Sequence, residues 1–254
     1  MPTPVVAIFG PTGVGKTAVA LSLADLLRGR GEDPVAISAD ALQVYRGLET
    51  LTGVATAEEQ ARLEHRLLSF VPVTEGFSVG TYMPLAHAEI DRAVAAGRRP
   101  IVVGGTGLYL RAALAELSMR RAGPGEESEL WSSATRHPTL LCGLVMERRA
   151  LYAAIEARVD TMVAAGAEHE VRAAEAEGPS RTARKALGFD ELLRGDIDAM
   201  KQRSRNYARR QLTWMRKMAG VQTIDVTRRD AADVAAEIGR RLVTGREVSQ
   251  RPAP

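Results

Sequence analysis

The sequence predicts an α/β fold: a parallel sheet with helices on both faces, followed by a mostly helical C-terminal part. Short apolar runs rich in valine and isoleucine recur through the first part of the chain, as in strands that are buried on both faces. Longer segments with alanine and leucine at helical spacing separate these runs. Beyond residue 146, helical periodicity dominates.

Strands and helices alternate from the start of the chain. The run 4–9 is apolar and β-branched, and it leads through a glycine-rich turn into a helix over 16–28. A second buried strand is predicted over 34–38. Helical periodicity then returns over 57–63 and 79–96.

The second half continues the sheet and then adds helices. A strand over 100–103 precedes a helix over 107–117, and a strand over 140–145 follows a polar connection. Further helices are expected at 147–177, 181–194, 196–219 and 230–243, with a last strand at 221–226. We divide the chain into an α/β core (1–118), a connection (119–138), the last core strands with the C-terminal helices (139–244), and a tail (245–254).

The composition is that of a globular protein in a reducing compartment. Apolar residues make up 45% of the chain and charged residues 26%, which excludes a disordered chain. The single cysteine, Cys142, lies in an apolar run, and the four histidines are isolated, so neither a disulfide nor a metal site is predicted by spacing. No segment reads as a signal peptide or a membrane span, so we expect a cytoplasmic protein without a membrane partner. A monomer is compatible with this composition.

A phosphate-binding motif stands between the first strand and the first helix. Residues 10–17 read Gly-Pro-Thr-Gly-Val-Gly-Lys-Thr and fit G-x-x-x-x-G-K-[ST]. Glycines let successive N–H groups turn inward, and the helix N-terminus adds partial positive charge. This context favours a P-loop NTPase-like core over a ligand-free turn. The predicted cradle consists of Gly10, Pro11, Thr12, Gly13, Val14, Gly15, Lys16 and Thr17, with the Thr17 hydroxyl suited to Mg²⁺.

A carboxylate is expected near this cradle, but not where a nucleotide hydrolase carries it. The strand over 100–103 ends in Gly104-Gly-Thr106 without an acid, which weakens an ATPase or kinase interpretation. The strand over 34–38 instead delivers Asp40. Asp40 could hold a metal or act as a base, or it could simply cap a turn or helix.

Several strings, in this order after the P-loop, resemble the tRNA dimethylallyltransferases (tRNA isopentenylpyrophosphate transferases). They are Asp40-Ala-Leu-Gln-Val-Tyr-Arg-Gly47, Phe77-Ser-Val79, Val103-Gly-Gly-Thr-Gly-Leu-Tyr-Leu110, Ala186-Leu-Gly-Phe189 and Arg203-Ser-Arg-Asn-Tyr-Ala-Arg-Arg-Gln-Leu-Thr-Trp214. The resemblance extends from Val6 to Trp214.

The resemblance implies transfer of a dimethylallyl group from dimethylallyl diphosphate to the N6 amine of an adenosine beside the anticodon. The P-loop would then bind a diphosphate leaving group. By the same resemblance, Asp40 is the general base, while Lys16, Thr12, Arg205 and Thr17 with Mg²⁺ hold the diphosphate. Arg210 is the fallback for Arg205.

The resemblance also implies which residues contact the tRNA. A base in the anticodon loop must leave its stack to reach a buried site, so the protein has to grip the flipped base. The residues that match substrate-contacting positions of the family are Asp40, Ala41, Leu42, Gln43 and Thr106, to which we add Arg210.

A basic helix is predicted over the last motif. Between residues 201 and 217 there are seven lysines and arginines and no acid, with Tyr207 and Trp214 seven residues apart on one face. Such a face suits phosphate contacts and base stacking. The alternative is a solvated helix whose aromatic residues pack into the core.

The chain departs from the family pattern in three places. The family carries a helical insert of several dozen residues where this chain has only the connection 119–138, which includes Trp131. The family's Gly-Thr-Ala-Lys-Pro is replaced by residues 51–55, with loss of a lysine, and a glutamine is replaced by Lys185. Modification of tRNA with a smaller footprint is therefore the first expectation. The alternatives are prenylation of a free adenine nucleotide, a small-molecule kinase or ATPase, and a non-catalytic RNA-binding paralogue.

Overall fold

The chain forms one six-stranded sheet in which every strand is parallel to its neighbours, as predicted. The computed structural model describes residues 4–118 and 129–244. The strand order is β3-β2-β4-β1-β5-β6. The strands are β1 (Val5–Phe9), β2 (Pro34–Ser38), β3 (His65–Arg66), β4 (Arg99–Gly104), β5 (Thr139–Val145) and β6 (Gln222–Asp225).

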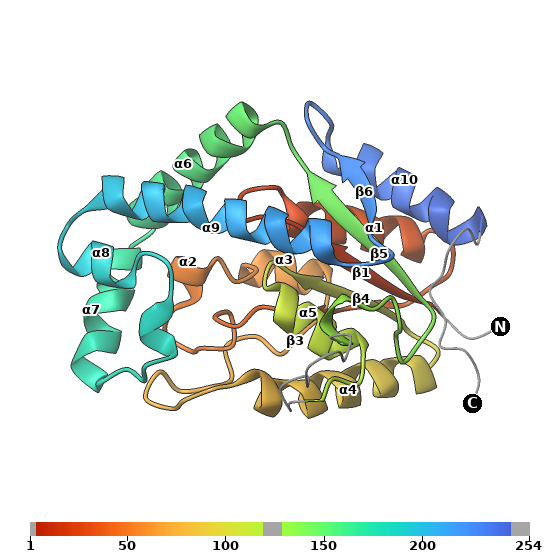
Figure 1. The fold of residues 1–254 in the computed structure, drawn as a ribbon, viewed down its shortest axis with the longest axis horizontal. Coiled ribbons are helices and arrows are strands. Elements are labelled where there is room, and N and C mark those ends of the chain that lie inside the picture. Colours follow the sequence, from red (N-terminus) through yellow and green to blue (C-terminus); the bar gives the residue numbers. More distant parts are fainter. Residues whose placement is uncertain (1–3, 119–128, 245–254) are drawn as a thin grey trace, which may run out of the picture.

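Helices cover both faces of this sheet, and a further group extends to one side of it (Figure 1). The core helices are α1 (Lys16–Arg28), α2 (Glu49–Thr52), α3 (Ala57–Arg62), α4 (Val79–Ala95) and α5 (Gly107–Leu114). The helices after β5 are α6 (Arg148–Ala164), α7 (Ala167–Glu177), α8 (Phe189–Leu193), α9 (Ile197–Lys217) and α10 (Ala231–Thr244). Short 3-10 turns are η1 (Glu129–Trp131) and η2 (Ala183–Lys185).

The apolar runs of the sequence are buried because they occupy the middle of the sheet. Alternate residues of β1 enter two apolar layers, with Val5 and Phe9 in one and Val6 and Ile8 in the other. Helices α4 and α5 supply the first layer, and α1 and α10 the second. Cys142 of β5 belongs to the second layer, where burial raises the pKa of its thiol to about 12, as expected of an inert cysteine.

Parallel pairing brings the carboxyl ends of three strands to one edge of the sheet. Ile8 pairs with Val103, and Ser38 pairs with the same residue from the other side. A Cβ on Gly104 would lie only 2.2 Å from the carbonyl oxygen of Ala39, so glycine is required where β4 passes the end of β2. This edge is the position at which open α/β sheets bind their ligands.

Three parts of the sequence-based assignment were wrong in detail. The helix predicted over 147–177 is two helices, because Gly166 turns the chain with a φ of +94°. The helix predicted over 181–194 is only η2 and α8, separated by Gly188 with a φ of +97°. The short elements β3 and α2 were not predicted at all, since two and four residues carry no readable periodicity.

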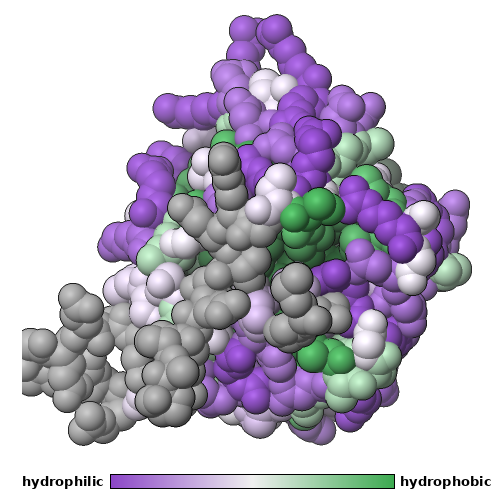
Figure 2. Space-filling view, turned by 90° about the vertical axis from the view of Figure 1, so that its right-hand side faces the viewer, coloured by the Kyte–Doolittle hydropathy of each residue, from purple (hydrophilic) through white to green (hydrophobic). Residues whose placement is uncertain are grey.

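The described surface is largely polar. Leu85 and Val243 are the large hydrophobic side chains found exposed in residues 4–118 and 129–244. Among the residues coloured in Figure 2, hydrophilic ones predominate, and hydrophobic ones gather in patches. Within the same residues, no helix has the length and apolar character needed to cross a membrane. The first half of the predicted connection (119–128) and the whole tail (245–254) lie outside the described residues.

Gly166→Ala is expected to lower the free energy of unfolding by about 1–2 kcal/mol, because a left-handed backbone is unfavourable for residues with a Cβ. A Cβ at Gly166 meets no atom within 4 Å, so the cost is purely conformational. The matched control is Gly76→Ala, whose Cβ also meets nothing but whose φ is not positive. Urea unfolding midpoints measure both. Equal stability of the two variants would contradict the break between α6 and α7.

Candidate active site

The predicted phosphate cradle forms the turn between β1 and α1. Gly13 and Gly15 have φ of +81° and +90°, in the left-handed region that favours glycine. The first N–H groups of a helix have no acceptor within it, so the start of α1 offers donors to an anion. Five of the eight predicted cradle residues line a cavity beside this turn: Thr12, Gly13, Gly15, Lys16 and Thr17.

Lys16 lies at the centre of the cradle. Its Nζ donates to the carbonyl oxygens of Gly10 and Pro11, each at 3.0 Å. Desolvation and the nearby Arg158 guanidinium lower the pKa of Lys16 to about 8, and Asp40 opposes this shift. Burial and charge repulsion therefore disfavour the charged form of Lys16, and a bound anion would favour it.

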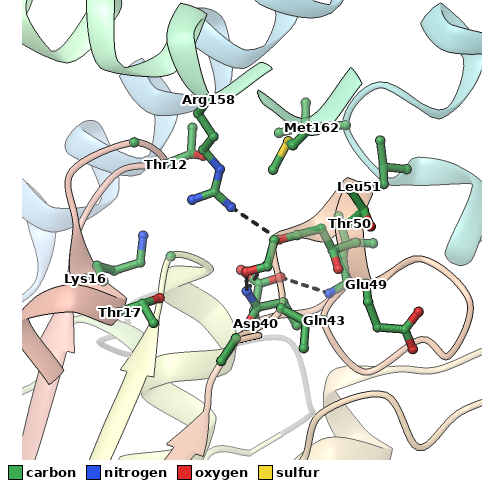
Figure 3. A pocket seen from close by; sticks show the side chains of 18 of the residues that line it. Thr12, Lys16, Thr17, Asp40, Gln43, Glu49, Thr50, Leu51, Arg158 and Met162 are labelled. Atoms are coloured by element: carbon green, nitrogen blue, oxygen red, sulfur yellow. Dashed lines mark hydrogen bonds between the residues drawn. The ribbon is translucent and has the colours of Figure 1, made fainter. Parts of the chain in front are cut away.

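The cavity has a volume of about 950 Å³ and lies at the carboxyl ends of β1, β2 and β4. Lys16 enters it from the P-loop, Arg158 from α6 and Asp40 from the loop after β2 (Figure 3). Burial lowers the pKa of Arg158, and the Asp40 carboxylate acts in the opposite direction. Lys16, Arg158 and the Asp40 carboxylate thus line one space that can hold a ligand.

Arg158 was not identified from the sequence, although its position carried a signal. In α6 it lies between Ile155 and Val159, on the face that is buried against the rest of the chain. A cation on the apolar face of an amphipathic helix requires an anionic partner or a polar cavity. Its Nη2 lies 3.4 Å from the Thr52 carbonyl oxygen. A Cβ on Gly53 would come within 1.9 Å of the same nitrogen, so Gly53 makes room for the guanidinium.

Arg205, in contrast, is not brought to the cavity, contrary to our expectation. Its guanidinium pairs with Glu156 of α6 and donates to Gln202 at 2.6 Å. The physical reason is helical rotation: Ser204, Tyr207 and Gln211 line the cavity and lie on one face of α9. The residue after Ser204 is turned by about 100° from that face and meets α6. The diphosphate role of Arg205 remains a prediction.

Asp40 combines the two interpretations that the sequence left open. One carboxylate oxygen accepts the backbone N–H of Leu42 at 2.9 Å, so Asp40 does cap its turn. The same side chain also lines the cavity. A carboxylate whose orientation is set by a local hydrogen bond is suited to accept a proton from a positioned ligand.

The predicted adenosine-contacting residues are held together by α9. The Tyr207 hydroxyl lies 3.3 Å from Thr106 Oγ1, which in turn lies 3.5 Å from the backbone nitrogen of Ala41. Burial raises the pKa of Tyr207 to about 12, and Asp40 acts in the same direction. Tyr207 therefore stays a neutral hydroxyl next to the carboxylate.

Gln43 is engaged by the protein itself in this structure. Its Nε2 donates to the carbonyl oxygen of Gly53 at 2.9 Å, and its Oε1 lies 3.1 Å from Ser38 Oγ. The side chain thereby anchors the turn after α2 to the end of β2. Contact between Gln43 and a flipped base remains a prediction, and it requires these bonds to exchange.

An aliphatic wall lines the cavity beside the P-loop, with side chains from α2 and α6. Helix α2 is held there by Glu170 of α7, which accepts the backbone N–H groups of Thr50 and Leu51 at 2.8 and 2.9 Å. Such a wall offers a branched hydrocarbon a place out of water, next to the cradle. The aliphatic side chains that line the cavity include Leu42, Leu51, Ile155, Val159, Met162 and Met200.

The oxygen donors beside the cradle suit Mg²⁺ bound together with a phosphate. The described residues contain no cluster of three or more His, Cys, Asp or Glu side chains that could hold a metal ion by themselves. Thr17 supplies a hydroxyl in the cavity. Mg²⁺ is commonly held by one or two protein oxygens together with phosphate oxygens and water. The donor set therefore fits a metal that arrives with a diphosphate.

Comparison with known proteins identifies the family to which this arrangement belongs. The model of the IPP transferase family matches residues 43–136 and 125–218. The chain belongs to this family. It is 37% identical to the tRNA dimethylallyltransferase of Rhodospirillum centenum, over 84% of the chain and 88% of that relative. The family assignment confirms the resemblance inferred from the motifs.

A longer relative shows what this family member lacks. The alignment with the tRNA dimethylallyltransferase of Symbiobacterium thermophilum is 33% identical and covers 96% of both proteins. It extends over 310 positions, although the chain has 254 residues. The relative thus carries several dozen residues without a counterpart here. The two segments matched by the family model meet at 125–136, within the connection.

Solved structures confirm the fold. The tRNA isopentenylpyrophosphate transferase of Bacillus halodurans superimposes with a TM-score of 0.81 at 30% identity, covering 95% of this chain and 97% of that one. The corresponding transferase of Staphylococcus epidermidis gives 0.80 at 25% identity, covering 96% and 100%. The α/β core and the helical C-terminal part of this IPP transferase are thus those of its family.

Affinity for a diphosphate should depend on the Lys16 proton. The pKa of Lys16 is about 8, and a bound diphosphate favours the charged form and raises this pKa. Affinity for a non-reactive thiolodiphosphate analogue of the donor is therefore expected to fall above about pH 8, by up to about tenfold per pH unit. Calorimetric titration across this range measures it. Lys16→Arg keeps its charge and should show a flat profile, and a flat profile in the unaltered chain would contradict the assignment.

Arg158→Gln should weaken binding of the same analogue by about 10- to 100-fold, the magnitude of a lost hydrogen bond to a charged group. Arg205→Gln serves as the matched variant, because it removes an equal charge from a guanidinium that pairs with Glu156 outside the cavity. We expect it to change the affinity by less than about threefold. A larger loss of affinity in Arg205→Gln than in Arg158→Gln would assign diphosphate binding to Arg205 and exclude it for Arg158.

Proposed function

We propose that this IPP transferase moves a dimethylallyl group from dimethylallyl diphosphate to the N6 amine of an adenosine beside the anticodon of a tRNA. The observation that carries the proposal is a cavity in which Lys16 of the phosphate cradle and Arg158 of α6 lie opposite the Asp40 carboxylate, beside aliphatic side chains. The names of the similar proteins, tRNA dimethylallyltransferases and tRNA isopentenylpyrophosphate transferases, support the same activity.

The cations account for departure of the diphosphate. Lys16, Arg158 and the N–H groups at the start of α1 stabilise the charge that grows on the leaving oxygen as the allylic C–O bond breaks. Mg²⁺, bound with Thr17 as a ligand, would neutralise further phosphate charge. The five-carbon group meanwhile lies against aliphatic side chains, which exclude water from the allylic carbon.

The carboxylate accounts for the attacking amine. As the new N–C bond forms, the N6 amine gains positive charge and must lose a proton. Asp40 accepts this proton, and the Leu42 N–H that it caps keeps the carboxylate oriented. Thr106 and Tyr207, joined at 3.3 Å, hold the edge of the base next to Asp40.

The proposed acceptor determines where the reaction takes place and in what assembly. A tRNA substrate places the activity in the cytoplasm. The cavity is formed by residues of one chain, so a monomer is sufficient for the chemistry.

Asp40→Asn should lower the rate of prenyl transfer by about 10²- to 10⁴-fold, the usual contribution of a positioned base, while affinity for the donor analogue stays within a few-fold. The assay offers labelled dimethylallyl diphosphate in parallel to unmodified tRNA and to adenosine monophosphate. We expect label in the tRNA alone. Near-normal turnover by the variant would exclude Asp40 as the base. Label only in the nucleotide would replace the tRNA proposal with a free-nucleotide acceptor, and label in neither would exclude the transfer reaction.

A further inference from the structure

We propose that a second cavity, on the outer side of α9, binds one unstacked base of the substrate RNA together with its phosphate, next to the adenosine that is modified. This inference rests on the proposed function and adds a site to it. The cavity has a volume of about 620 Å³. The described residues that line it are Trp131, Asn206, Arg209, Arg210, Thr213, Trp214 and Lys217.

Two indole rings form the floor of this cavity. The ring centroids of Trp131 and Trp214 are 4.7 Å apart, with their planes inclined by 47°. Both side chains are only partly buried, although large aromatic residues gain most from full burial. A partly open aromatic surface is the usual stacking platform for a base of single-stranded RNA.

The rim of the cavity is cationic. Arg209, Arg210 and Lys217 are exposed, and the described lining residues include no acid. Lys217 Nζ lies 5.6 Å from the Trp131 ring centroid, and the Arg210 guanidinium lies 5.4 Å from that of Tyr207. Neither Arg210 nor Lys217 forms an ion pair with a carboxylate of the described residues. Their charges therefore remain available to phosphates, which favours nucleic acid over a protein partner.

The position of the cavity ties it to the active site. A Cβ on Gly107 would lie 2.5 Å from the Trp214 ring, so the indole packs directly against the residue after Thr106. Tyr207, which joins Thr106 to α9, precedes Trp214 by two helical turns, about 10 Å along the axis. A strand that places its adenosine beside Asp40 can therefore place a neighbouring base of the same loop on Trp131 and Trp214.

Trp131 comes from the connection that is short in this chain. Its ring lies against Trp214 of α9, so the short connection adds an aromatic side chain to this face of the helix. Through the second cavity, the chain thus binds the anticodon loop by one base and does not need contacts along the stem.

The decisive experiment is a double-mutant cycle on RNA binding by the full chain. The probes are an unmodified anticodon stem-loop and the same RNA with an abasic nucleotide next to the target adenosine, tested on each side in turn. Trp131→Ala and one of the two abasic changes should each weaken binding by about 10- to 100-fold. Combined, they should cost little more than either alone, because both remove one contact. Trp131→Phe should retain most of the affinity.

Lys217→Ala tests the rim by removing the ammonium group that lies over the Trp131 ring, while both indole rings are retained. It should weaken binding of both RNAs and reduce the slope of log affinity against log salt by about one, as expected for one phosphate contact. Its matched control is Arg240→Ala, which removes an exposed charge from α10 and should leave the slope unchanged.

The outcomes separate this inference from the proposed function. Unchanged stem-loop affinity in Trp131→Ala, with prenyl transfer to tRNA intact, overturns the second cavity alone. Additive losses in the cycle overturn it as well, because they place the base elsewhere. Transfer to adenosine monophosphate without any binding of the stem-loop overturns the proposed acceptor and this inference together.

Discussion

The active site depends on one buried side chain, Gln211 of α9, which joins the C-terminal helices to the edge of the sheet. Its Oε1 accepts the backbone N–H of Thr12 at 2.8 Å, and its Nε2 donates to the Gly105 carbonyl oxygen at 2.7 Å. The side-chain amide of Gln211 thereby links the P-loop to the turn after β4. Gln211 is buried, so breaking either bond would leave a buried amide group without a partner. With α9 held in this register, Tyr207 meets Thr106 and Arg210 is directed away from the cavity.

The positive charges in the cavity are only partly balanced by the protein's own carboxylates. Burial lowers the pKa values of Lys16 and Arg158, and repulsion from Arg158 lowers that of Lys16 further; Asp40 offsets these shifts only in part. A diphosphate supplies the missing negative charge. Its departure from the allylic carbon then adds charge at the place where the protein is already positive, so the same arrangement binds the donor and favours the transition state over the ground state.

Helix α9 lines both the cavity proposed for the prenyl donor and the cavity proposed for a base of the acceptor RNA. Its inner face lines the first cavity, with Tyr207, and its outer face lines the second, with Trp214. One helix can therefore orient a flipped adenosine and a neighbouring base together, which compensates for a shortened connection. The arginines of this helix have different partners: Arg203 and Arg205 pair with Glu191 and Glu156, while Arg210 lies over the Tyr207 ring.

The sequence by itself determined the parallel α/β core, the family, the phosphate cradle and the presence of Asp40 beside it. These features depend on local patterns: apolar runs of strand length, glycines where the backbone turns left-handed, and motifs of adjacent residues. The tertiary structure decided what depends on distant segments. Arg158 lies near Lys16 because α6 packs across Gly13. Arg205 lies outside the cavity because the helical rotation of one residue directs it toward α6. Trp131 meets Trp214 across more than eighty residues of chain, a contact that no local periodicity encodes.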